Sequence, residues 1–199
     1  MDLIKTPRAT RSALKLVTDA TVDPVSLDDA KLYLRVAHSD EDGLILSQVK
    51  AAARKVKEDT RRALTTETWD QAVDRFPVSG PLEVLLSPLL TVTSITVYAA
   101  DDTSSVLASS NYVVDTYSVP GRVFLSTTGA WPSNVRSYLA GVIRFTCGFG
   151  ATATTVPADL LEAVKLQLLG LYQRRDLTDA EQRVYDYLIA PWKVYFVGA

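Results

Sequence analysis

Apolar residues recur with helical spacing near the start of the chain. Ile45, Val49, Ala52 and Val56 are three or four residues apart, which places them on one face of a helix over 41–64. A shorter helix is predicted over SLDDAKLYLRV, because the Ser26 hydroxyl can cap its first free amides. The pattern therefore predicts two helices before residue 65.

Between Thr66 and Gly150 the pattern changes to short, β-branched segments in which apolar and polar residues alternate. Turn residues such as Asp101-Asp102 and Pro120-Gly121 separate them. The predicted strands lie in TETWDQAVDRF, PLEVLLS, TVTSITVYA, NYVVDT, GRVFLS and GVIRFTCGF. Five or six strands at this spacing predict an antiparallel sheet or a small sandwich, inserted between helices.

Helical spacing returns after Pro157, which is a favourable first-turn residue. The helix that follows is apolar on most of its circumference, so it must be buried on most of its circumference. This indicates a packed bundle or a subunit interface. Thr178 and Glu181 form a capping box that opens another helix, which ends before Pro191. The chain therefore has the features of a part that assembles.

These elements predict an α+β fold: a helical core of about four helices plus a C-terminal tail, with an inserted antiparallel β domain. Residues 1–24 lack periodicity and are predicted to be a mobile N-terminal arm that ends at Asp23-Pro24. The further predicted boundaries are 25–65 for the first part of the helical core, 66–150 for the β domain, 151–190 for the second part of the core and 191–199 for a docking tail.

Composition excludes several function classes. The net charge of −2 gives no general attraction to nucleic acid or anionic membrane, and no apolar run is long enough for a membrane span. The single cysteine, Cys147, excludes an internal disulfide and is expected to be buried. The single histidine, His38, leaves no His-pair metal site and no triad. Gly148-Phe149-Gly150 lacks the spacing of a phosphate loop and is expected to be a strand exit. We expect no catalytic activity, metal or cofactor.

Two groups of residues are candidates for binding. A basic cluster lies near the end of the helix at 41–64 and consists of Arg54, Lys55, Lys57, Arg61 and Arg62. Because acidic residues are mixed with it, a solvated face or an intersubunit contact is one interpretation, and a contact with the DNA backbone is another. The second interpretation would make the chain a non-specific DNA-binding module. No stacking aromatic residues are interleaved with the cluster.

The second group is the apolar tail, which consists of Pro191, Trp192, Lys193, Val194, Tyr195 and Phe196. Its alternating residues have the period of an extended strand. The tail either folds back over its own core or docks on a neighbouring protein by strand addition or groove insertion.

The order of these segments resembles the head–tail connector, or adaptor, family of tailed bacteriophages, in its longer form with a β insertion. The resemblance rests on LKLVTDATVDPVSLDDAKLYLRV, the acidic start of DEDGLILSQVKAAARKVKEDT, SPLLTVTSITVY, NYVVDTYSVPGRVFLS, Trp131-Pro132 and LIAPWKVYF, and it extends from about Leu14 to Phe196. The long helix of the family usually ends in Thr-Gly-Arg, whereas this chain has Thr60-Arg61-Arg62.

The resemblance implies a structural protein without enzymatic activity, cofactor or metal. It implies a ring, typically of twelve copies, that lies beneath the portal protein at the virion neck, after assembly in the host cytoplasm. Such a ring extends the DNA channel, touches packaged DNA only transiently and docks a stopper or tail-completion protein. The family's C-terminal segment commonly reaches the portal, which would place Trp192, Lys193, Tyr195 and Phe196 at that contact.

Overall fold

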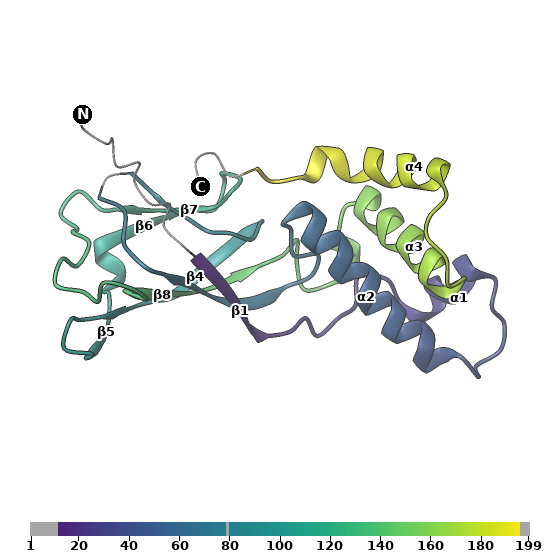
Figure 1. Cartoon of the computed structure of the whole chain (residues 1–199), viewed down its shortest axis with the longest axis horizontal. Coiled ribbons are helices and arrows are strands. Elements are labelled where there is room, and N and C mark those ends of the chain that lie inside the picture. Colours follow the sequence, from purple (N-terminus) through teal and green to yellow (C-terminus); the bar gives the residue numbers. More distant parts are fainter. Residues whose placement is uncertain (1–11, 79, 196–199) are drawn as a thin grey trace, which may run out of the picture.

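The computed structural model describes residues 12–78 and 80–195, which form a helical layer beside two β-sheets (Figure 1). The helices are α1 (Leu27–Leu34), α2 (Asp42–Thr60), α3 (Ala158–Tyr172) and α4 (Asp179–Ile189). Short 3-10 turns are η1 (Ser109–Asn111), η2 (Ala153–Thr155) and η3 (Ala190–Trp192). Four helices that flank antiparallel sheets in the sequence confirm the α+β fold class.

The helix starts follow the capping signals of the sequence. The Ser26 hydroxyl accepts a hydrogen bond of 3.1 Å from the Asp29 amide at the start of α1. Thr178 and Glu181 form both halves of the capping box of α4. The helix predicted over 41–64 ends earlier, at Thr60, because Arg61 adopts a left-handed conformation with φ of 57° that terminates α2.

Helix α3 is the centre of the helical layer, with α1, α2 and α4 packed around it (Figure 1). Its buried residues are Leu160, Ala163, Val164, Leu166, Leu168 and Gly170. The apolar residues around α3 are therefore buried mainly by other helices of the same chain. Of the two explanations offered by the sequence, the structure supports the packed bundle for this helix.

The strands form two antiparallel sheets. The larger sheet has the order β1-β2-β8-β4-β5 and the smaller has the order β3-β7-β6. Their bounds are β1 Ser12–Thr18, β2 Glu67–Val73, β3 Leu82–Glu83, β4 Leu89–Tyr98, β5 Ser104–Val106, β6 Tyr112–Asp115, β7 Arg122–Leu125 and β8 Gly141–Cys147. The six predicted segments all contain a strand, and β1 and β5 are additional strands.

Strand β1 corrects the prediction of a mobile arm over residues 1–24. Residues 12–18 pair antiparallel with β2 and form one edge of the larger sheet. Leu14 packs against the sheet core, while Lys15 on the opposite face is exposed. The alternation is too short to stand out in the sequence, and the pairing depends on β2, which lies about fifty residues later. Residues 1–11 lie outside the described part.

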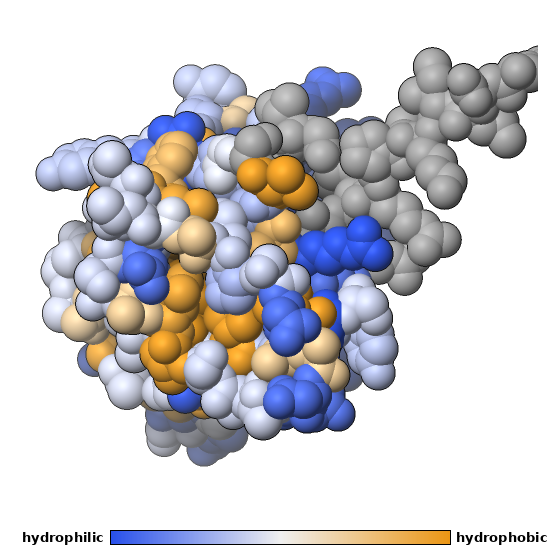
Figure 2. All heavy atoms as spheres, turned by 90° about the vertical axis from the view of Figure 1, so that its left-hand side faces the viewer, coloured by the Kyte–Doolittle hydropathy of each residue, from blue (hydrophilic) through white to orange (hydrophobic). Residues whose placement is uncertain are grey.

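The chain has two apolar cores. One lies among the helices and includes Ile45, Val49 and Leu160, and the other lies between the sheets and includes Ile143 and Phe145. The end of the molecule formed by the strands shows apolar side chains among polar ones on its surface (Figure 2). Within the described residues, no helix has the length and apolar character that a membrane span requires.

Candidate functional site

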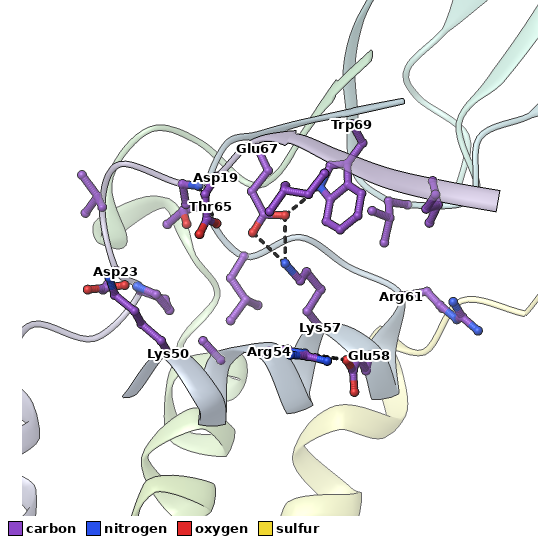
Figure 3. Close-up of a pocket in the computed structure, with 18 residues that line it drawn as sticks. Asp19, Asp23, Lys50, Arg54, Lys57, Glu58, Arg61, Thr65, Glu67 and Trp69 are labelled. Carbon is purple, nitrogen blue, oxygen red and sulfur yellow. Dashed lines mark hydrogen bonds and ion pairs between the residues drawn. The ribbon is translucent and has the colours of Figure 1, made fainter. Parts of the chain in front are cut away.

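A groove of about 490 Å³ lies between α2 and the segment that begins with β1 (Figure 3). Its apolar lining comes from both parts of the fold: Leu14, Leu16, Ala20, Val22, Pro24, Ala53, Leu64, Trp69 and Leu86. Edge strand β1 forms one wall and α2 forms the other. The groove therefore lies where the helical layer meets the larger sheet. Its apolar lining can receive apolar side chains.

A basic stripe on α2 and its C-cap lines the groove: Lys50, Arg54, Lys57 and Arg61. These residues are four, three and four positions apart, so they share one helix face. The basic cluster predicted from the sequence contains Arg54, Lys57 and Arg61 together with two residues that do not line the groove, and it lacks Lys50. The same spacing rule that identified the buried stripe of α2 would have found Lys50.

Lys57 is held in the groove by a mostly buried ion pair. Its Nζ lies 2.9 and 3.0 Å from the two carboxylate oxygens of Glu67, and the indole Nε1 of Trp69 donates to Glu67 at 2.7 Å (Figure 3). The Lys57 ammonium also lies 5.1 Å from the Trp69 ring centroid. Removal of either partner would leave a charge unpaired in a poorly hydrated site. The pair therefore fixes the start of β2 on α2.

The other cations of the stripe are more accessible. Arg54 pairs with Glu58 at 2.9 Å but its side chain is 75% exposed. Lys50 and Arg61 line the groove and form no ion pair with residues 12–78 or 80–195. These two residues and Arg54 can thus meet the carboxylates of an incoming partner.

Lys55 and Arg62, the other two residues of the predicted basic cluster, do not line the groove. Lys55 binds Asp59 one turn later, at 2.6 Å. Arg62 is half-buried, and its Nε donates a hydrogen bond of 2.7 Å to the carbonyl oxygen of Trp192. Burial lowers the pKa of the Arg62 guanidinium. The five residues of the predicted cluster therefore lie in three different places. Arg54, Lys57 and Arg61 line the groove, Lys55 lies on the surface of α2, and Arg62 contacts the tail.

The C-terminal tail packs on its own helical core as far as Val194. The Val194 amide donates to the carbonyl oxygen of Thr60 at 3.1 Å, and the Val194 side chain is buried. The Trp192 ring meets the Phe149 ring edge-on, with centroids 5.7 Å apart, and lies under the Arg62 guanidinium. This is the fold-back arrangement, one of the two alternatives that the sequence left open.

The remaining tail residues differ in accessibility. Pro191 and Tyr195 are exposed, and Lys193 is partly buried. Phe196, the last residue of the predicted docking segment, lies outside the described residues. Pro191 and Tyr195 are thus accessible at the surface, whereas Trp192 and Val194 pack against the chain itself.

The described residues contain no group of three or more His, Cys, Asp or Glu side chains that could hold a metal ion. His38 is exposed and lies 3.8 Å from Asp40. Cys147 is buried, as expected, and burial raises the pKa of its thiol well above its usual range. Gly148 has φ of 133°, and a side chain there would collide with the Thr65 carbonyl. Glycine is therefore required where the chain leaves β8 and passes close to the Thr65 backbone.

Comparison with known families matches residues 24–117 to the family described as Phage gp6-like head-tail connector protein. The matched part contains α1, α2 and strands β2 to β6. No curated protein matches the chain.

Solved structures share the fold over nearly the whole chain. A chain in the virion of a native gene transfer agent (GTA) particle superposes with a TM-score of 0.78 at 23% identity, covering 94% of this chain and 97% of that chain. A chain in the neck of a native GTA particle, computed with C12 symmetry, gives a TM-score of 0.77 at 22% identity and covers 94% and 98%.

Identities this low establish the common fold, while the family match connects the sequence itself to connectors. It begins at Pro24, just before α1, and includes the basic stripe of α2. The resemblance found in the sequence is confirmed: residues 24–117 match the phage gp6-like head–tail connector family.

Proposed function

We propose that this protein is a structural head–tail connector that forms a ring at the neck of a phage-like particle. The observation that carries the proposal is the family match over residues 24–117, in a chain whose fold agrees with neck proteins over 94% of its length. The C12 symmetry of a GTA neck supports a ring of twelve copies. No enzymatic step, metal or cofactor enters this proposal.

The proposed partners are the portal protein on one side of the ring and a stopper or tail-completion protein on the other. The ring would extend the DNA channel and contact packaged DNA only transiently. Assembly would take place in the host cytoplasm, before the ring becomes part of the neck.

The tail over 191–196 is the proposed portal contact. Pro191 and Tyr195 are exposed, which supports a direct role for them. The Trp192 indole Nε1 is buried and has no hydrogen-bond partner among the described residues. An unsatisfied buried donor costs about 1–3 kcal/mol, which makes release of the folded-back tail easier. Docking on the portal would then give this N–H an acceptor.

The mass of the full chain mixed with purified portal protein tests this function. Native mass spectrometry is expected to give a complex that contains twelve copies of the chain per portal ring. Absence of a complex at micromolar concentrations would contradict the proposal. The tail is tested by Tyr195→Ala, which should weaken portal binding, with Tyr138→Ala as a matched control because Tyr138 is similarly exposed on the β part.

A DNA-binding module remains the alternative function, and the structure gives it less support. Arg54 and Lys57 of the basic stripe already bind carboxylates, and Arg62 binds the tail. A module of this kind predicts duplex affinity that falls steeply with added salt. A connector whose channel lets DNA slide predicts weak affinity at low salt, so a titration with duplex DNA at several salt concentrations separates the two.

A further inference from the structure

Helix α4 and the turn after it carry a second apolar stripe that the fold of one subunit does not use. This outer stripe consists of Ala180, Val184, Tyr187 and Pro191, at spacings of four, three and four residues. Val184 is 52% exposed and Tyr187 is 80% exposed. The inner face of α4, in contrast, buries Tyr185 and Ile189 almost completely. An amphipathic helix needs only one apolar face to pack on its own core, so the outer stripe requires a partner.

The outer stripe and the groove lie on different sides of the subunit. The hydroxyl of Tyr185 donates a hydrogen bond of 2.7 Å to Asp59, so the Asp59 side of α2 faces α4. The groove-lining residues Lys57 and Arg61 are each two positions from Asp59, which places them about 160° away around the helix axis. The outer stripe therefore cannot fill the groove of its own subunit, whereas it is free to fill the groove of another copy.

Some charges on the two surfaces are complementary. The carboxylates of Asp19, Asp23, Glu58 and Glu67 also line the groove, but two of its cations, Lys50 and Arg61, have no ion pair among the described residues. Asp179 and Asp186 are exposed on α4 beside the outer stripe, seven residues and about 10 Å apart along the axis. Arg54 and Arg61 are also seven residues apart on the wall of the groove. When α4 lies along α2 of another copy, Arg61 can meet one of these carboxylates and Arg54 can meet the other by exchanging its exposed pair with Glu58. Val184 and Tyr187 then enter the apolar groove. Such pairs fix the register of an interface.

We propose that the outer stripe of each subunit docks in the groove of the next subunit, and that this contact is the repeating interface of the ring. The inference rests on the proposed function, because it specifies how that ring is held together. Two different surfaces on opposite sides of a subunit form a head-to-tail contact, and repetition of one such contact closes a ring when the rotation per subunit permits.

Disulfide crosslinking tests the interface directly. The only native cysteine, Cys147, is buried, so engineered thiols can be followed separately. The full chain with Val22→Cys in the groove and Tyr187→Cys in the outer stripe is expected to give a ladder of linked subunits under mild oxidation. The matched control pairs Tyr187→Cys with Val106→Cys, which is exposed on β5 at the sheet edge opposite β1, and should give no ladder beyond dimers.

Charge reversal gives a second test that does not depend on a single variant folding well. One chain carries Asp179→Lys with Asp186→Lys, and the other carries Arg54→Glu with Arg61→Glu. Each chain alone then has two surfaces of like charge and is expected to remain monomeric by mass, while an equal mixture of both should recover the ring. Recovery in the mixture shows that both variants are folded.

The outcomes distinguish this inference from the proposed function. A wild-type ring by mass, with no crosslinked ladder and with both charge-reversed chains still assembled, overturns the inference and leaves the connector function intact. A wild-type chain that forms no ring, with or without portal protein, overturns the connector function and the inference with it.

Discussion

The guanidinium Nε of Arg62 donates a hydrogen bond of 2.7 Å to the main-chain carbonyl of Trp192, 130 residues later in the sequence. The bond joins the residues just after α2 to the turn that follows α4. Next to it, the Val194 amide bonds to Thr60. The end of α2 is therefore the place where the C-terminal tail is fixed.

Arg62→Ala is expected to loosen the tail without disrupting the helical layer. The variant loses a charge-assisted hydrogen bond, which contributes about 1.5–3 kcal/mol. Trypsin should then cleave after the partly buried Lys193 faster than in the wild type, as measured by mass spectrometry. Lys55→Ala is the control, because Lys55 is paired on the exposed side of α2. Equal cleavage rates in all three proteins would show that Arg62 does not hold the tail.

Arg61→Gly is expected to stabilise the protein. Arg61 has φ of 57°, a left-handed conformation that costs a non-glycine residue about 1–2 kcal/mol, part of which glycine loses again through its more flexible unfolded state. We expect a net gain of about 0.5–1 kcal/mol in the free energy of unfolding, measured in urea. Arg61→Ala controls for the lost charge and should give no gain; a gain as large as that of glycine would contradict the argument.

Gly148→Ala is expected to destabilise the β part strongly. A Cβ at this position would collide with the Thr65 carbonyl oxygen, in a backbone conformation with φ of 133°. Strain of this kind alone costs about 1–3 kcal/mol, and the collision adds to it. The midpoint of thermal unfolding should fall clearly. Gly43→Ala in the first turn of α2 meets no atom within 4 Å and is expected to leave the midpoint unchanged or raise it.

Acidification is expected to weaken the start of α4. Hydrogen bonds from Arg175 and from Thr178 lower the pKa of Glu181 to about 2. A carboxyl group with a lowered pKa in the folded state stabilises the fold above its unfolded pKa, near 4.5, and loses this contribution as the pH falls toward 2. The difference in unfolding free energy between wild type and Glu181→Gln should therefore shrink between pH 4.5 and pH 2. Glu162→Gln, in an exposed pair with Lys165, serves as the control.

Local signals in the sequence were sufficient to locate the helices and to predict the starts of α1 and α4. Ser26 and the Thr178–Glu181 pair act within one helical turn, so their effect does not depend on the rest of the chain. The buried stripe of α2 could be identified for the same reason. The end of α2 was placed too late because nothing in Arg61 signals a left-handed residue, and the usual signal, glycine, is absent.

Features that depend on distant residues were harder to predict. Strand β1 needs β2 as its partner, and the tail needs Arg62 and Phe149, which lie far from it in the sequence. The groove is lined by residues from both parts of the fold, which are far apart in the sequence. Only its basic residues on α2 could be predicted, and Lys50 was not among them. Residues that share a surface by tertiary contact leave no periodic pattern.

The position of β8 in the larger sheet has a consequence for synthesis of the protein. This strand lies between β2 and β4, which do not pair with each other, although it follows both in the chain. A growing polypeptide therefore lacks the central member of the sheet until Cys147 has left the ribosome. Until then, the edges of β2 and β4 that pair with β8 stay open, and α3, which lies in the middle of the helical layer, has not yet emerged. Both halves of the molecule thus become complete only late in translation, after most of the subunit has already emerged.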